Sequence, residues 1–202
     1  MEQWVETRAV VVEGRGSHAI VRLNRPAERN SLSVATLVEL DAIISALSAR
    51  DDISTITLTG TGDAFASGAN IRELRALTSE TAREFAFHGQ RLMQRIADVP
   101  QLTIAAVNGY CMGGGLDLAL ACDLRCASPA AVFAHPGARL GIITGWGGTQ
   151  RLPRLIGQTR ALEMFTTARR VTATEAFEIG LVNRVAEPVL ECALDLTRAS
   201  YG

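Results

Sequence analysis

The chain has 202 residues, of which 48% are hydrophobic and 20% are charged, and its formal net charge is −1. This length and composition predict one main domain with a single sizeable core, and the near-zero charge argues against a nucleic-acid partner. The acidic residues 1–6 lack the apolar segment of a signal peptide, and the most apolar stretch, residues 102–124, is interrupted by Asn108, glycines and Asp117. We therefore expect no membrane span and a cytoplasmic location.

Hydrophobic periodicity predicts strands that alternate with helices along the chain. Strands are expected at residues 9–13, 18–23, 53–59, 102–107, 123–127 and 132–134. Helices are expected at about residues 33–50, 80–97, 114–122, 149–155, 159–167, 172–177 and 189–200. Ser33 is the predicted N-cap of the first helix. This alternation is typical of parallel strands joined by helical crossovers.

A glycine-rich turn at residues 108–115, followed by an apolar helix, is the most informative segment. A turn that opens a helix leaves backbone N–H groups free at the positive end of the helix dipole, so it suits an oxygen that is negative or becomes negative. A phosphate loop of the Walker type would continue with Lys and Ser or Thr, whereas Leu116 and Asp117 follow here, and the Rossmann glycine spacing is also missing. Of the two ligands considered, phosphate and a thioester oxygen, the thioester oxygen remains. The simpler alternative is that the turn binds no ligand and its glycines only let a helix pack close to a strand.

The cysteines give no sign of a metal centre. Cys111, Cys122, Cys126 and Cys192 form no CxxC pair and have no histidine at zinc-ligand spacing. We interpret them as reduced, mostly buried thiols and expect no metal site. Cys111 lies in the glycine-rich turn, but the sequence places no base beside it, which disfavours a nucleophilic role.

Two further motifs accompany the glycine-rich turn. A small-residue turn at residues 64–74 follows the strand expected at 53–59 and also leads into a helix, and a third block spans residues 140–157. Together the three motifs resemble the crotonase superfamily, also called the enoyl-CoA hydratase/isomerase family, from about Val10 to Val185. The resemblance implies an α/β fold of the ClpP/crotonase type, which is a right-handed spiral of ββα units with two roughly perpendicular sheets.

The resemblance also implies an enzyme that acts on an acyl-CoA thioester. In the family, two backbone N–H groups form an oxyanion hole that polarises the thioester carbonyl and stabilises an enolate. By motif match these groups belong to Ala69 and Gly114. Coenzyme A enters as part of the substrate, so no separate cofactor is expected.

The small-residue turn is implied to bind the coenzyme A part of the substrate. The residues expected to line its groove are Ala66, Gly68, Asn70 and Ile71. Arg72 stands where many relatives place a lysine near the nucleotide phosphates, and Arg29 is a further candidate for that contact. Either arginine could instead be a solvated surface charge.

The carboxylates are where the chain departs from the family. Relatives that hydrate a double bond hold one water between two glutamates, whereas this chain has Asp117 at one position and Gly137 at the other. Because each acid–base group contributes roughly 10²- to 10⁴-fold, hydration by the two-glutamate route should be heavily impaired. If residues 133–137 run extended, His135 points the same way as Gly137 and becomes a candidate acid or base, with a packed histidine as the alternative. For Asp117, the alternative is mere compensation of the helix dipole.

Gly137 also leaves room for a bound anion such as bicarbonate. Naphthoate synthases of the superfamily have a glycine here, but in this chain Thr144 stands near the position of their aspartate and Phe165 replaces their anion-binding tryptophan. We therefore rank that function below hydration and isomerisation. Trp146 and Gln150 are expected to pack rather than to react.

We expect a core domain over residues 1–187 and the start of a shortened C-terminal helical region over residues 188–202. Relatives continue with helices that cover the active site and help to build trimers or hexamers, so the assembly of this chain stays open. Three functions are considered: an enoyl-CoA hydratase/isomerase with Asp117 as its principal acid or base, a decarboxylase or hydrolase of a thioester, and a catalytically silent acyl-CoA binder. The first matches the motifs over most of the chain.

Overall fold

The computed structural model describes residues 2–7 and 9–198, and its strands form two sheets. The larger sheet contains, in spatial order, β1 (Glu2–Glu6), β2 (Val10–Arg15), β3 (His18–Leu23), β4 (Thr55–Gly60), β6 (Leu102–Val107), β8 (Leu124–Ala127) and β11 (Arg184–Val185). Its first three strands are antiparallel neighbours, and from β3 onward the neighbours are parallel. The smaller sheet contains β10 (Val171–Thr172), β9 (Val132–Ala134), β7 (Tyr110–Met112) and β5 (Ala64–Ala66).

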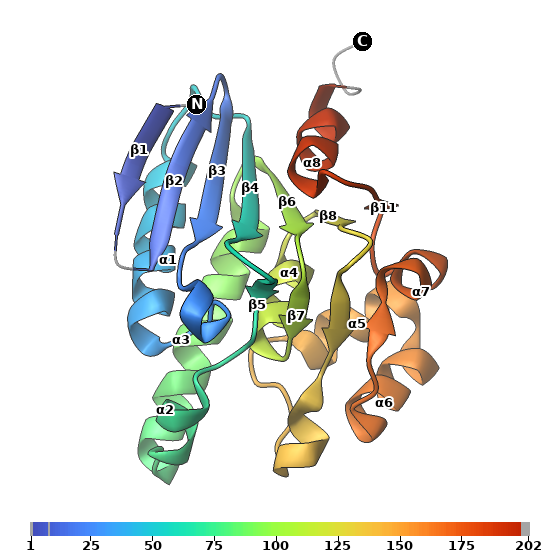
Figure 1. The fold of residues 1–202 in the computed structure, drawn as a ribbon. Coiled ribbons are helices and arrows are strands. Elements are labelled where there is room, and N and C mark those ends of the chain that lie inside the picture. The colour runs from blue at the N-terminus through green and yellow to red at the C-terminus, as the bar shows by residue number, and fades with distance from the viewer. Residues whose placement is uncertain (1, 8, 199–202) are drawn as a thin grey trace.

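Three successive units build this arrangement (Figure 1). In the pairs β4–β5, β6–β7 and β8–β9, the first strand joins the larger sheet and the second joins the smaller sheet. Helical segments follow each pair before the chain returns to the larger sheet. The smaller sheet therefore collects β5, β7 and β9 as parallel neighbours, which places the chain segments that follow them side by side.

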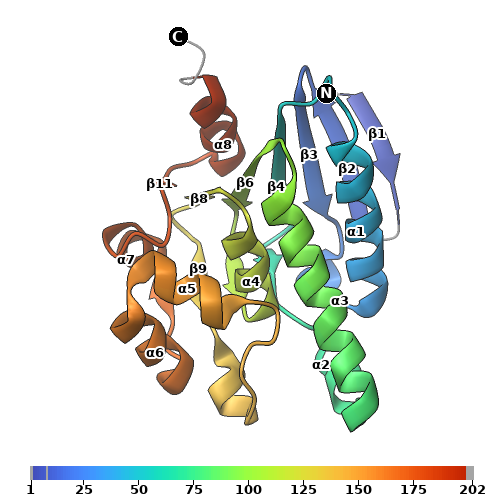
Figure 2. The same cartoon turned by 180° about the vertical axis from the view of Figure 1, so that it is seen from behind.

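Two long helices cover one face of the larger sheet (Figure 2). They are α1 (Val34–Ser48) and α3 (Ser79–Asp98), and they pack against each other. Ser33 caps α1 as predicted, because its side chain accepts a hydrogen bond from the N–H of Thr36. Thr78 caps α3 in the same way and forms a reciprocal capping box with Thr81.

A short central helix connects the two sheets. The shorter helices are α2 (Ile71–Arg75), α4 (Gly114–Ala121), α5 (Gly148–Ile156), α6 (Gln158–Thr167) and α7 (Ala173–Glu178), with 3₁₀ turns η1 (Pro26–Glu28) and η2 (Pro136–Leu140). Every residue of α4 from Gly115 to Ala121 is buried, and the helix contacts α3, α5 and strands of both sheets. A helix that is apolar on all sides is typical of a protein interior. The glycine-rich turn that opens α4 is less deeply placed, because Gly113 and Gly114 are only partly buried and line a cavity.

The last helix, α8 (Val189–Arg198), packs on the opposite face of the larger sheet from the main core. Side chains alternate along β6, so Ile104 and Ala106 face α8 whereas Ala105 and Val107 face the main core. The predicted domain boundary at residue 187 falls just before α8 and stays a prediction. The predicted end of this helix at residue 200 lies outside the described residues.

Among the described helices, α8 included, we find no segment with the length and hydrophobicity that a membrane span requires.

The long predicted elements are confirmed to within a few residues, whereas several short strands are new. The periodicity does not predict β1, β5, β7, β10 or β11. These strands have two to five residues. Such runs are too short for a period of two to stand out, and two of them were interpreted as parts of small-residue turns. Sheet pairing between distant segments defines these strands.

The segment before α5 is fixed by a tryptophan that packs against α3. The side chain of Trp146 is 3% exposed, and its ring lies 5.3 Å from that of Phe85. A Cβ built on Gly89 would overlap the indole, so α3 approaches the tryptophan closely only because residue 89 has no side chain.

Substituting Gly89→Ala is expected to destabilise the protein. Alanine is the better helix former by about 1 kcal/mol, but overpacking against a buried ring costs about 1–3 kcal/mol, so we expect a net loss of up to about 2 kcal/mol in the free energy of unfolding. Urea unfolding measures this change. The matched control is Ala97→Gly at an exposed position of α3, which should cost about 1 kcal/mol through helix propensity alone. A more stable Gly89→Ala protein would contradict the tight packing.

Candidate active site

The small-residue turn after β5 and the glycine-rich turn after β7, called the two bends from here on, meet at their backbones. A Cβ built on Gly68 would lie 3.2 Å from the nitrogen of Gly114, and a Cβ built on Gly114 would lie 3.4 Å from the nitrogen of Ala69. The parallel pairing of β5 with β7 brings the bends together, because each bend directly follows one of these strands. Gly68 has a φ of +99°, a conformation that side chains rarely adopt.

Both predicted oxyanion-hole amides are free of backbone acceptors in the part of the chain that the structure describes. The carbonyl of Gly68 accepts from Leu32 and the N–H of Asn70 donates to Leu32, so the intervening amide of Ala69 points away from that pairing. Gly114 begins α4, where the first N–H groups have no acceptor within the helix. Two N–H groups from different elements thus lie close together without a backbone acceptor among the described residues.

An apolar cavity of about 420 Å³ opens in front of these amides. Its walls come from both bends, from α2 and α3, and from residues 136–146. The residues that line it are Ser67, Gly68, Ala69, Ile71, Leu74, Leu77, Ala82, Phe85, Ala86, Gly113, Gly114, Asp117, Pro136, Gly137, Leu140, Ile142, Ile143, Thr144, Gly145 and Trp146. Asp117 is the single ionisable residue among them.

The carboxylate of Asp117 is buried but reaches the cavity wall. Burial raises its pKa to about 6, against opposing effects that are led by the hydroxyl of Thr144, which donates a hydrogen bond to Oδ2. The backbone amides of Trp146 and Gly148 and the charge of Arg151 also lower the pKa. The other oxygen, Oδ1, has no hydrogen-bond partner within the described chain. This carboxylate can therefore both accept and return a proton near neutral pH.

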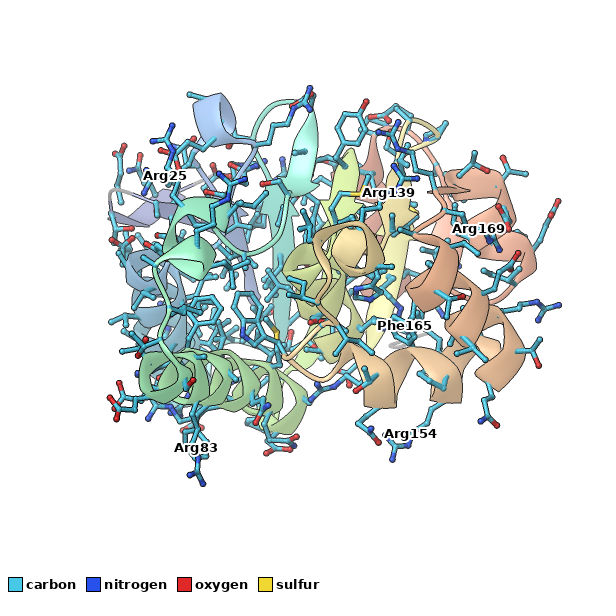
Figure 3. All side chains as sticks on the ribbon, turned by 90° about the horizontal axis from the view of Figure 1, so that it is seen from below. Arg25, Arg83, Arg139, Arg154, Phe165 and Arg169 are labelled. Atoms are coloured by element: carbon cyan, nitrogen blue, oxygen red, sulfur yellow. The ribbon has the colours of Figure 1, made fainter. Side chains whose placement is uncertain are left out.

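His135 lies behind Asp117 and does not line the cavity. Its Nε2 is 3.7 Å from Oδ1 of Asp117, and its ring lies 5.0 Å from that of Phe165. Phe165 is partly buried against the main core, and Figure 3 shows Arg83 and Arg154 pointing outward from the surface. Burial lowers the pKa of His135 to about 4, so the imidazole is neutral at pH 7. Neither ring nitrogen has a hydrogen-bond partner among the described residues.

The chain does not run extended from 133 to 137, which separates His135 from Gly137. Strand β9 ends at Ala134, and η2 begins at Pro136. The turn places Gly137 on the cavity wall while His135 points into the protein. The premise that both residues face the same way is therefore wrong, because Pro136 starts a 3₁₀ turn where a strand was assumed.

The predicted coenzyme A residues divide into two groups. Gly68 and Ile71 line the cavity, and Ile71 is 49% exposed at its rim. Ala66 is fully buried against the start of α4 and does not line the cavity, while the side chain of Asn70 accepts hydrogen bonds from the first N–H groups of α2. Ala66 therefore packs in the interior and Asn70 caps α2, and neither residue lines the cavity.

The two candidate arginines differ in their surroundings. Arg29 forms an ion pair with Asp63 at 3.1 Å and its guanidinium lies 4.9 Å from the ring of Tyr110. Arg72 is exposed on α2, next to the cavity residue Ile71. Arg72 therefore has its charge available to an anion, whereas the charge of Arg29 is already paired.

The sequence interpretation missed the role of Thr144. It was considered only as the residue that replaces an aspartate, yet its hydroxyl is the polar group that faces the buried carboxylate of Asp117. The sequence predicts packing for Trp146 and no role for Gly148. In the structure the backbone amides of both residues face the Asp117 carboxylate. No local signal could reveal these contacts, because 27 residues separate Thr144 from Asp117.

Comparison with known proteins decides the family. The sequence profile of the enoyl-CoA hydratase/isomerase family matches residues 13–198. The chain belongs to the enoyl-CoA hydratase/isomerase family. It is 40% identical over 185 residues to a short-chain-enoyl-CoA hydratase of Clostridium acetobutylicum, an alignment that covers 91% of this chain and 71% of that protein. It is 41% identical over 180 residues to a crotonyl-CoA hydratase of Syntrophomonas wolfei, with 89% and 69% covered.

Solved structures of this family confirm the crotonase fold. A crystal structure of an enoyl-CoA hydratase from Bacillus anthracis superposes with a TM-score of 0.91 at 38% identity, covering 95% of this chain and 76% of that one.

Among the described residues, no cluster of three or more histidine, cysteine, aspartate or glutamate side chains could hold a metal ion.

Asp117 is expected to make the protein less stable as the pH rises. Its folded pKa of about 6 lies above the usual value near 4, so the folded state binds the extra proton and stability is lost between about pH 4 and pH 6. Asp117→Asn should remove this loss and gain on the order of 2–3 kcal/mol at pH 7. Urea unfolding of both proteins from pH 4 to pH 7 measures the difference.

The quantity to compare is the slope of the unfolding free energy against pH in the original chain and in Asp117→Asn. His135 contributes a slope of the opposite sign to both proteins, so only the difference between the two slopes reports on Asp117. The lowered pKa of His135, about 4, means that stability is lost as the pH falls. Asp98→Asn, at an exposed position of α3, is the matched control and should change the slope little. Equal pH slopes for Asp117→Asn and the original chain would contradict the raised pKa.

Proposed function

We propose that this chain is an acyl-CoA enzyme of the enoyl-CoA hydratase/isomerase type in which one carboxylate performs the proton transfers. The observation that carries the proposal is the cavity that joins two free amides, of Ala69 and Gly114, to Asp117 as its single ionisable wall residue. Asp117 has a pKa of about 6, which suits a group that must take up and return a proton near neutral pH.

Isomerisation needs only this machinery. The carboxylate of Asp117 takes a proton from C2 of a 3-enoyl thioester, and the negative charge moves onto the thioester oxygen as an enolate. The N–H groups of Ala69 and Gly114 donate hydrogen bonds to that oxygen, and one such donor is worth roughly 10²- to 10³-fold in rate. The protonated carboxyl group then delivers the proton to C4, and the double bond comes to rest between C2 and C3.

Hydration requires more from the site than isomerisation. Addition of water to a 2-enoyl thioester needs a base for the water and an acid for C2, and Gly137 brings no second acid to the cavity wall. Asp117 must then serve both steps, because its neighbour His135 lies behind it rather than in the cavity. We therefore propose that isomerisation is faster than hydration, with His135 as a residue that orients the Asp117 carboxylate.

The cavity walls fit an aliphatic acyl group. Phe85, Ile142 and Ile143 are apolar, and most of the other lining residues are also apolar. At the rim, Ile71 would contact the pantetheine chain and Arg72 would bind the nucleotide phosphates. In the same scheme Ala66 and Asn70 shape the bend, and Arg29 adds positive charge nearby. Coenzyme A is part of the substrate, and a cytoplasmic location completes the proposal.

A thioester decarboxylase is the second candidate, favoured by the position of Gly137. Loss of carbon dioxide from a malonyl-type thioester also leaves an enolate on the two amides, and a single acid then protonates C2. Gly137 has no side chain, so the part of the cavity wall that it forms lacks the second acid that hydration would need. Hydrolysis of the thioester and binding without turnover are the remaining outcomes of the same assay.

The activity assay compares crotonyl-CoA, a 3-enoyl-CoA and malonyl-CoA, with products followed by mass spectrometry. We expect turnover of the 3-enoyl-CoA and slower hydration of crotonyl-CoA. Asp117→Ala should lower the isomerisation rate roughly 10²- to 10⁴-fold, because no other ionisable residue lines the cavity. Asp98→Ala is the exposed control and should keep full activity. The proposal fails if neither enoyl thioester reacts, or if Asp117→Ala retains full activity.

Thr144 is expected to set the pH at which the enzyme becomes active. Its hydroxyl lowers the pKa of Asp117, so Thr144→Val should raise that pKa and move the acidic limb of kcat/KM to higher pH. Thr144→Ser keeps a hydroxyl and should leave the limb near its original position. Rate measurements with the 3-enoyl-CoA between pH 5 and pH 9 test this. Coincident limbs for the valine and serine proteins would show that the hydroxyl does not tune Asp117.

A further inference from the structure

Two of the four cysteines lie in contact with each other, far apart in sequence. The sulfur of Cys126 on β8 is 3.5 Å from the sulfur of Cys192 on α8, and both residues are buried. The other two cysteines differ, because the thiols of Cys111 and Cys122 donate to backbone carbonyls of their own chain neighbourhood. One pair of sulfurs is therefore already positioned side by side.

The pair sits beneath a helix that is attached apart from the main core. The residues that join α8 to the larger sheet form a cluster separate from the main core. Its buried members are Ile104, Ala106, Cys126, Val189, Cys192 and Ala193, and Leu102, Leu124, Ala186, Leu190 and Leu196 pack against them while partly exposed. At the surface, Arg15 and Glu191 form an ion pair of 2.7 Å that ties α8 to β2. A helix held by a separate cluster can open locally while the main core stays folded.

We propose that Cys126 and Cys192 form an oxidant-sensitive dithiol, a modification site at which a two-electron oxidant such as a peroxide forms a disulfide that fastens α8 to β8. The sulfurs have to approach from 3.5 Å to about 2 Å, a change that side-chain rotation and small helix shifts supply. The site lies on the opposite face of the sheet from the cavity and is independent of the proposed catalytic function.

The reaction proceeds in two balanced steps. Cys192, on the helix that opens, attacks hydrogen peroxide as a thiolate, which forms a sulfenic acid and releases hydroxide. After α8 closes, the sulfur of Cys126 attacks the sulfur of the sulfenic acid on Cys192. The hydroxyl group of the sulfenic acid leaves and takes up the proton of the Cys126 thiol, which gives water. The proton that Cys192 lost neutralises the hydroxide, so two thiols and one peroxide give one disulfide and two waters.

Burial explains why the pair persists as thiols until α8 opens. Burial is the main cause that raises the pKa of the Cys126 thiol to about 12, and contact with the Cys192 sulfur contributes to the same shift. The thiolate is the form that reacts with oxidants, so the Cys126 thiol is unreactive toward peroxide, and burial keeps the oxidant away from both sulfurs while α8 is closed. Opening of α8 carries Cys192 toward water and exposes it to the oxidant.

The experiment treats the purified chain under native conditions with excess hydrogen peroxide, blocks remaining thiols, and maps peptides by mass spectrometry without reduction. We expect one cross-linked peptide pair that joins Cys126 to Cys192 and disappears after treatment with a dithiol reductant. Cys111 and Cys122 act as internal controls and should stay alkylatable. A Cys111→Ser, Cys122→Ser double variant should form the same cross-link, and its Tm should rise on oxidation.

Cys192→Ala is the variant that should lose the effect. Oxidation of this protein should give no intramolecular cross-link and no rise in Tm, while its isomerase activity before oxidation should match that of the original chain. The proposal is overturned if peroxide leaves Cys126 and Cys192 as thiols under conditions that oxidise a small dithiol. It is overturned equally if all four cysteines react at similar rates, because contact between the two sulfurs would then give no advantage.

Discussion

The close approach of two backbone bends is the constraint on which the site depends. The bend after β5 and the bend after β7 meet where Gly68 and Gly114 have no side chains, and a Cβ on Gly68 would lie only 2.7 Å from the carbonyl of Met112. At Gly115 a Cβ would overlap the carbonyl of Ala66 beneath. A larger residue at Gly68 or Gly115 would push the two bends apart, whereas a side chain at Gly114 would overlap the ring of Trp146.

Burial of Asp117 connects the stability of the fold to its chemistry. The desolvated carboxylate costs folding free energy at neutral pH, and the hydroxyl of Thr144 with the nearby amides offsets only part of that cost. The remaining imbalance holds the pKa near 6, where a group exchanges protons readily. An exposed aspartate would be cheaper to fold but would stay ionised and would return a proton poorly. Residues that tune catalysis here therefore also tune stability.

The sequence predicts well where periodicity or backbone chemistry carries the information. Helix α1 with its cap Ser33 follows from apolar spacing, and the meeting of the Ala69 and Gly114 bends follows from motifs whose function needs only main chain. Prediction fails where distant segments decide the structure. Strand β7 is three residues long and is defined by its partners β5 and β9, and the contact of Thr144 with Asp117 arises from tertiary packing. The orientation of His135 depends on the turn that Pro136 starts.

Gly137 and the segment after it are best understood as one structural change. A Cβ on Gly137 would lie 2.5 Å from the carbonyl of Ile142, whose N–H donates to the carbonyl of residue 137. The backbone of residues 137–142 thus closes on itself at a point where hydrating relatives are implied to carry a glutamate. Adding that side chain alone would force the Ile142 carbonyl away before any carboxylate could reach the cavity. Absence of the second acid is therefore built into the backbone of this turn, which is why the proposed chemistry relies on Asp117 and the two amides alone.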